Sequence, residues 1–205
     1  MKVLIVRTAD SPPTFITSFF GAKIANFLRN EGFEVTEIVD WIRSSKLGWW
    51  WAKKYDLILY LGHGETDKLL GNIYLGLVLP FLDMTNIPIT RNKIIITYAC
   101  LSAKKLGKYA VKYSKAYTGS DYFMYVAFPE EIDYASFFYE PFQAMIRDFI
   151  NGKTIGESVE TYKSIAMRNA LRIQSFSSPE AQVYANYLML NAKHYQVLGD
   201  ASLSL

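Results

Sequence analysis

The sequence predicts a three-layer α/β fold, in which a mostly parallel sheet is flanked by helices. Two near-continuous apolar runs, 55–61 and 93–98, have the pattern of central parallel strands covered on both faces. Segments with helical spacing alternate with strand-like runs along the chain, as they do where helices pack on a parallel sheet. The chain has 205 residues and no repeat, low-complexity tract or linker-like stretch. We therefore expect a single domain, residues 1–205.

The first third of the chain predicts a strand, a helix and an edge strand. Val3–Val6 is the first strand, and the helix after it should end at Asn30-Glu31-Gly32. Apolar residues at helical spacing predict that helix: Phe15, Phe19, Phe20, Ile24, Phe27 and Leu28. Polar residues interrupt the next strand, Phe33–Val39, which suits a sheet edge. The tryptophan-rich stretch that follows, Trp41 and Trp49–Trp51, predicts no particular element.

The second half predicts further strands and mostly helices. Strands are expected near Ala116–Thr118 and at Tyr122–Phe128. Helical patterns cover four segments: Leu101–Tyr113, Ile132–Ile150, Ile155–Arg172 and Pro179–Lys193.

Composition excludes several classes of protein. Hydrophobic residues make up 51% of the chain and charged residues 20%, which is incompatible with a disordered chain. A net charge of +3 does not favour binding to nucleic acid or to an anionic membrane. The longest apolar stretch, Ile73–Leu82, contains Gly76 and Pro80 and is too short to span a bilayer, so we expect no membrane segment. The single cysteine excludes an internal disulfide and suits a reducing compartment, and the cytoplasm is the default expectation.

The two most apolar strands are each followed by a chemically reactive side chain. The first leads into Gly62-His63-Gly64 and the second into Ala99-Cys100. In an α/β sheet, ligands bind beyond the carboxyl ends of the strands, and the 37 residues between His63 and Cys100 allow one crossover to a neighbouring parallel strand. An imidazole facing a thiol promotes thiolate formation and can protonate a leaving group. Gly64 would let the backbone approach a substrate carbonyl, so the amides of Gly64 and Cys100 are the expected oxyanion hole.

Each of these residues also has an ordinary structural interpretation. A lone cysteine is often an inert buried side chain, and a histidine beside glycine is often a turn residue. Their joint placement after the two strongest strands favours a catalytic pair. Other sites lack support, because the sequence has no glycine-rich dinucleotide or phosphate loop, no nucleophile elbow and no Cys/His cluster. We therefore expect no cofactor and no metal, and we expect His194 to be a capping or surface residue.

At His63 and Cys100 the sequence resembles a known family. Leu57–Leu61 and the following His63-Gly64 form an apolar strand ending in His-Gly. Ile94–Tyr98 and the following Ala99-Cys100 form a later apolar strand ending in Ala-Cys. These motifs are similar to those of the caspase-like (clan CD) cysteine peptidases, which include caspases, legumain, clostripain, separase and the gingipains. The resemblance implies a caspase-like fold and a Cys/His dyad.

Two later segments point to one branch of that family. Gly152–Ser158 and Tyr195–Leu203 resemble the closing helix and the Leu-Gly-Asp-Pro-Ser-Leu ending of the gingipain-like and CHAT-type branch, with Ala201 in place of the usual proline.

The expected reaction is hydrolysis of a peptide bond in a protein or peptide substrate through a thioester on Cys100. Two alternatives stay open: a catalytically weak caspase-like module that binds partners, and a flavodoxin-like domain that binds a small molecule. A highly reactive Cys100 thiol would distinguish the peptidase from both alternatives. Peptidases of this family commonly select substrates by a charged pocket residue, and Asp121 and Asp10 are candidates that would select Arg or Lys. Asp10 could instead orient His63.

Two surface features suggest partners. The segment after Cys100 is basic, which is most simply a solvated helix face and alternatively a surface for nucleic acid or an acidic partner. Five lysines and three tyrosines form it: Lys104, Lys105, Lys108, Tyr109, Lys112, Tyr113, Lys115 and Tyr117. Trp49, Trp50 and Trp51 are a candidate docking surface for a protein partner.

Overall fold

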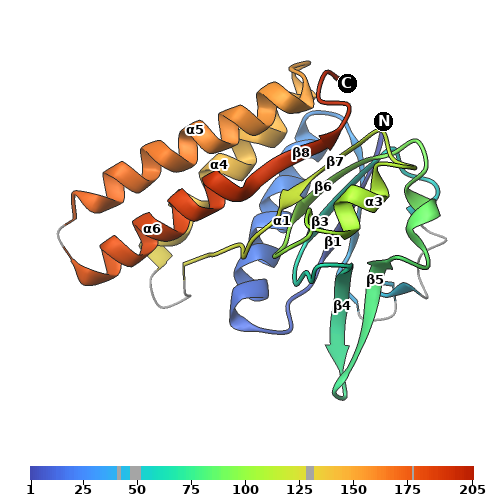
Figure 1. Ribbon diagram of the computed structural model, residues 1–205, viewed down its shortest axis with the longest axis horizontal. Coiled ribbons are helices and arrows are strands. Elements are labelled where there is room, and N and C mark those ends of the chain that lie inside the picture. Colours follow the sequence, from blue (N-terminus) through green and yellow to red (C-terminus); the bar gives the residue numbers. More distant parts are fainter. Residues whose placement is uncertain (41–42, 47–51, 128–131, 177) are drawn as a thin grey trace.

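The central feature of the fold is one twisted sheet. The computed structural model describes residues 1–40, 43–46, 52–127, 132–176 and 178–205. In these residues, six strands form one sheet in the order β2-β1-β3-β6-β7-β8, with only β8 antiparallel to its neighbour (Figure 1). The strands are β1 Lys2–Arg7, β2 Glu34–Ile38, β3 Leu57–Leu61, β6 Ile94–Tyr98, β7 Ala116–Ser120 and β8 Tyr195–Gly199.

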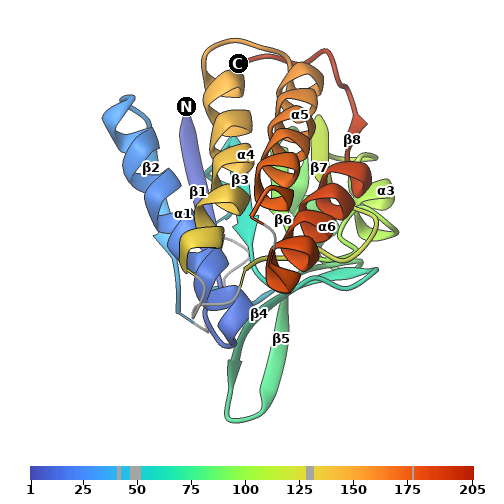
Figure 2. The same cartoon turned by 90° about the vertical axis from the view of Figure 1, so that its left-hand side faces the viewer.

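Helices cover one face of the sheet and a thinner layer covers the other. On the first face lie α1 Pro12–Asn30, α4 Ile132–Ile150, α5 Ile155–Gln174 and α6 Pro179–His194 (Figure 2). The second face packs against the short helices α3 Leu106–Ala110 and η2 Ile87–Thr90 and against residues 52–55. Successive residues of each central strand face opposite layers, so both layers need apolar side chains. The predicted three-layer α/β arrangement is confirmed.

The expected centre of the sheet is also confirmed. β1, β3 and β6 are adjacent and parallel, and β3 pairs with β6 in register from Leu57 with Ile94 to Leu61 with Tyr98. Every residue of β3 and β6 is buried, as continuous apolar runs predict. β2 lies at the edge of the sheet, where its polar residues meet solvent.

Several elements differ from the sequence-based expectations. The helix expected over Leu101–Tyr113 is confined to α3, with turns on both sides of it, and it cannot begin at Leu101, whose left-handed backbone (φ 54°) a helix does not allow. Residues 122–127 pair with no strand, so the strand predicted over Tyr122–Phe128 is wrong for its described part. The antiparallel hairpin β4 Lys68–Tyr74 and β5 Leu77–Asp83 was not predicted, and neither was β8.

The described helices include none with both the length and the apolar character needed to cross a membrane.

Helix α1 does not bury all of the apolar residues that predict it. Phe20 is 2% exposed and Ile24 is fully buried, whereas Phe15 and Phe19 are 62% and 55% exposed. Phe15 and Phe19 line an open groove of about 450 Å³ between α1 and α4, which Lys23 and Tyr139 also border. Only one stripe of α1 therefore contributes to the core.

We expect Phe20→Ala and Phe19→Ala to have very different effects on stability. Phe20→Ala leaves a cavity in the core and should lower the free energy of unfolding by about 3–5 kcal/mol. Phe19→Ala removes an exposed ring and should cost less than about 1 kcal/mol. Urea denaturation of the two variants measures both values, and equal losses would contradict this division of α1.

Candidate active site at the carboxyl ends of β3 and β6

The structure brings His63 and Cys100 to one cavity. β3 and β6 end side by side, and the pairing continues past the strands, since the Gly62 N–H donates to the carbonyl of Tyr98 at 3.2 Å. Both side chains line a cavity of about 40 Å³. Its other lining residues are Pro13, Thr14, Thr17, Gly62, Tyr98, Ala99, Met124 and Val126. The predicted pair thus occupies the predicted edge of the sheet.

Gly64 lies directly against the backbone of Cys100. A Cβ atom at Gly64 would come within 2.3 Å of the Cys100 carbonyl oxygen and 3.0 Å of the Ala99 Cβ, so only glycine fits. Within the described residues, neither the Gly64 N–H nor the Cys100 N–H donates a hydrogen bond to another residue. Both amides are therefore available to an oxygen atom of a ligand, as an oxyanion hole requires.

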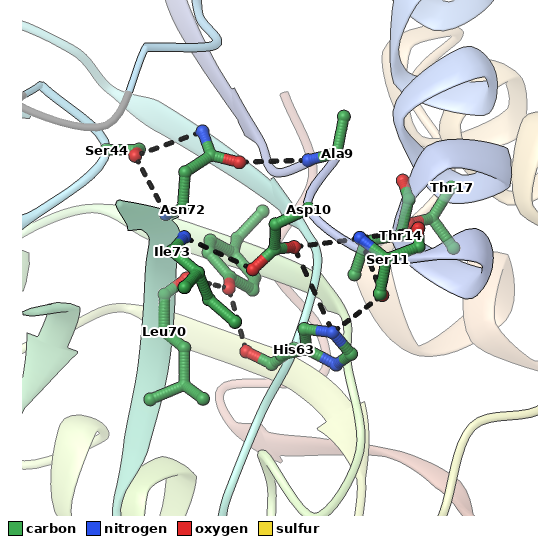
Figure 3. Close-up of polar contacts among 11 residues, drawn as sticks. Ala9, Asp10, Ser11, Thr14, Thr17, Ser44, His63, Leu70, Asn72 and Ile73 are labelled. Carbon is green, nitrogen blue, oxygen red and sulfur yellow. Dashed lines mark hydrogen bonds and ion pairs between the residues drawn. The ribbon is translucent and has the colours of Figure 1, made fainter. Parts of the chain in front are cut away.

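The imidazole of His63 is held from the loop that follows β1. Its Nε2 lies 2.8 Å from the Ser11 hydroxyl and 3.9 Å from Asp10 Oδ1 (Figure 3). The backbone is fixed as well, because the His63 carbonyl accepts from the Leu70 N–H at 3.0 Å and from the Tyr60 hydroxyl at 2.7 Å. Nδ1 makes no hydrogen bond in the described part of the chain. Nε2 thus contacts the protein, whereas Nδ1 is free to accept or donate a proton.

Asp10 is itself fixed by the hairpin and by α1. Its side chain is only 6% exposed, and it accepts hydrogen bonds from the Thr14 hydroxyl at 2.9 Å and from the Ile73 N–H at 3.2 Å. The amide of Asn72 secures the same loop, accepting from the Ala9 N–H at 2.9 Å (Figure 3). Of the two roles expected for Asp10, the geometry fits the orientation of His63.

Sequence reasoning missed Ser11 and Asn72. Ser11 had a readable signal, because a serine before Pro12-Pro13 marks a helix N-cap and so places its hydroxyl just beyond the end of β1. Asn72 gave no such signal, because its hairpin was not predicted.

The thiol of Cys100 is partly covered by the backbone of Met124. The Met124 N–H donates a hydrogen bond to Sγ at 3.3 Å, and the thiol donates one to the Met124 carbonyl oxygen at 3.7 Å. Burial raises the pKa of the Cys100 thiol above its usual value, and the hydrogen bond from Met124 only partly offsets this. At neutral pH the resting side chain is therefore the neutral thiol.

The structure does not bring Asp121 into this cavity. Its Oδ1 lies 2.8 Å from Nδ1 of His194 at the end of α6, and Tyr122 stacks on the His194 ring with centroids 4.7 Å apart. His194 is thus a partner of Asp121 rather than a plain surface residue. The expected docking surface at Trp49, Trp50 and Trp51 lies outside the described residues.

No group of three or more His, Cys, Asp or Glu side chains in the described part of the chain could hold a metal ion. Comparison of the sequence with protein-family models and with curated proteins gave no match.

We expect alkylation of Cys100 by iodoacetamide to follow an unusually alkaline pH profile. Because burial raises the thiol pKa, the midpoint of the rate should lie above the value of about 8.5 for a free cysteine. In urea the midpoint should return to about 8.5. A midpoint below 7 in the folded protein would show instead a resting thiolate.

Proposed function

We propose that this protein is a cysteine endopeptidase that uses Cys100 as nucleophile and His63 as its acid and base, in keeping with the resemblance to caspase-like peptidases. The observation that carries the proposal is the meeting of the Cys100 thiol and the His63 imidazole at one cavity. Next to them, Gly64 lies against the backbone of Cys100, and the N–H groups of both residues donate to no other described residue. Acyl transfer needs these groups within reach of one carbonyl.

In the proposed reaction, His63 takes the thiol proton and Sγ of Cys100 attacks the carbonyl carbon of the scissile bond. The N–H groups of Gly64 and Cys100 stabilise the negative oxygen of the tetrahedral intermediate. His63 then gives its proton to the leaving amine, and a thioester forms as the C–N bond breaks. Water attacks the thioester with His63 as base, which releases the carboxylic acid and restores the thiol.

Asp10 and Ser11 have a positioning role in this scheme. When His63 holds the thiol proton, the ring is a cation, and the carboxylate of Asp10 lies 3.9 Å from its Nε2. The Ser11 hydroxyl at 2.8 Å fixes the ring plane. A nearby carboxylate favours the charged imidazole and so favours formation of the thiolate.

We also propose that substrates carry a basic residue before the scissile bond, recognised by Asp121 when its contact with His194 is released.

The partners are then protein or peptide substrates, and the proposed compartment is the reducing cytoplasm, which preserves a reactive thiol.

A second candidate function is a caspase-like interaction module with weak catalysis. The specific observation in its favour is the state of the thiol, which is half-buried, has a raised pKa and lies beside a cavity of about 40 Å³. A peptidase must open this site, whereas an interaction module need not. Turnover by the pure protein decides between them.

We expect Cys100→Ala to abolish peptide hydrolysis and His63→Ala to lower kcat/KM by about 10²–10⁴-fold. The reason is that nucleophile and base act as a unit. A fluorogenic peptide library incubated with wild type and both variants measures the rates and the preferred residue before the cut. Hydrolysis by Cys100→Ala at the wild-type rate would exclude the proposal.

We expect Asp10→Asn to lower kcat about 10–100-fold with little change in KM, because it removes the charge that favours the His63 cation and keeps the shape of the side chain. The matched control is Asp148→Asn, which removes a carboxylate that binds Lys153 and Thr161 away from the site. Steady-state kinetics should show the loss of kcat for Asp10→Asn alone. Equal rates for the two variants would leave Asp10 without this role.

A further inference from the structure

Residues 121–127, which we call the cover segment, fill the space in front of Cys100. The cavity left at the Cys100 and His63 side chains is about 40 Å³, close to the volume of one water molecule. Sites that hold organic ligands are typically about 300–1,000 Å³. The cavity is therefore too small for a peptide as it stands, and the backbone of Met124 lies against Sγ.

The cover segment is attached mainly to helix α6, and the hydroxyl of Tyr98 in β6 adds one hydrogen bond to the Tyr125 carbonyl at 3.3 Å. The amide of Asn191 holds the backbone of Tyr125 at two points, accepting from its N–H at 2.9 Å and donating to its carbonyl at 2.8 Å. The ring of Tyr125 stacks on Tyr187, with centroids 4.3 Å apart and planes 6° apart. At the start of the segment, His194 binds Asp121 and stacks on Tyr122.

The ends of the cover segment differ in how firmly they are held. Ala127 is fully buried, whereas Tyr122 and Phe123 are 38% and 48% exposed. β7 stops at Ser120, so the segment forms no ladder of backbone hydrogen bonds with a neighbouring strand. Its backbone contact with the loop after Cys100 is a hydrogen bond from the Leu101 N–H to the Tyr122 carbonyl at 2.8 Å. Met124 and Tyr125 pack against the edge of the core, but the segment lacks the repeated backbone hydrogen bonds that fix a strand.

We infer that the cover segment is an autoinhibitory strap, which Asn191, Tyr187 and His194 of α6 latch over the thiol of Cys100. The described structure is the latent form, and the site opens when Tyr125 leaves Asn191. Opening withdraws Met124 from Sγ and frees the Asp121 carboxylate in the same movement. The regulatory meaning of the strap rests on the proposed function, but its protection of the thiol does not.

The test compares thiol protection in Asn191→Leu and Asn169→Leu. Asn191→Leu keeps the volume of the side chain and removes both hydrogen bonds to Tyr125. Asn169→Leu is the matched control, because Asn169 is equally buried and holds Phe137 and Glu140 on α4 instead of the cover segment. We expect iodoacetamide to label Cys100 at least tenfold faster in Asn191→Leu than in wild type, and at the wild-type rate in Asn169→Leu.

A second variant and a second measurement cover the case in which Asn191→Leu does not fold. His194→Ala removes the half-exposed contacts to Asp121 and Tyr122 and should also speed labelling. In wild type, hydrogen exchange at the amides of Leu101 and Tyr125 should be protected, and His194→Ala should raise their exchange rates.

The outcomes separate the strap from the peptidase. Faster labelling without hydrolysis supports the strap and counts against the proposed function. Equal hydrolysis by wild type and Asn191→Leu, with equal labelling, overturns the strap and leaves the peptidase standing. Wild-type labelling as fast as in the urea-unfolded chain also overturns the strap.

Discussion

The in-register parallel pairing of β3 with β6 determines the geometry of the whole candidate site. Leu61 lies beside Tyr98, and the Gly62 N–H extends the ladder by one further hydrogen bond. Just beyond the strands, Gly64 lies so close to the backbone of Cys100 that no side chain fits at Gly64. A shift of register by one residue would turn His63 or Cys100 to the opposite face of the sheet. The fully apolar strands make such a shift costly, since each strand is packed on both faces.

The fold could be predicted where local pattern and tertiary environment agree. β1, β3, β6 and the long helices are recognisable because buried strands are continuous apolar runs and amphipathic helices repeat every three to four residues. The hairpin β4–β5 was missed because Gly71 and Pro80 interrupt its pattern and its tip exposes Leu75 and Leu77. The apolar segment after β7 was taken for a strand, but Met124 binds a thiol and Tyr125 binds an amide side chain in place of a neighbouring strand.

The two reactive side chains of the candidate site could be predicted from the sequence, but the residues that hold them in place could not. His63 and Cys100 follow strands, so the rule for the carboxyl edge of a sheet places them. Asp121 obeys the same rule, but His194 arrives from 73 residues away to bind it, and no local pattern reveals such a partner. Ser11, Asn72 and Asn191 act through hydrogen bonds to segments distant in the sequence. Their positions depend on how separate elements pack, which sequence spacing alone does not encode.

The two reactive residues are also held by opposite ends of the chain. His63 is fixed by the β1–α1 loop and by strand β4 of the hairpin, all within residues 9–73, whereas Cys100 is partly covered by a segment that α6 secures. Each half of the site therefore has its own supporting contacts. Movement of the cover need not disturb the hydrogen bonds that orient the imidazole.

The ribosome synthesises Cys100 before the residues of α6 that hold the cover segment in place. Tyr187, Asn191 and His194 follow Cys100 by 87 to 94 residues, so the ribosome has already translated both reactive side chains well before it reaches the residues that secure the cover. At typical elongation rates this interval is on the order of ten seconds. During translation, the nascent protein therefore carries an unlatched thiol, which oxidants or electrophiles can reach before the C-terminal helix protects it.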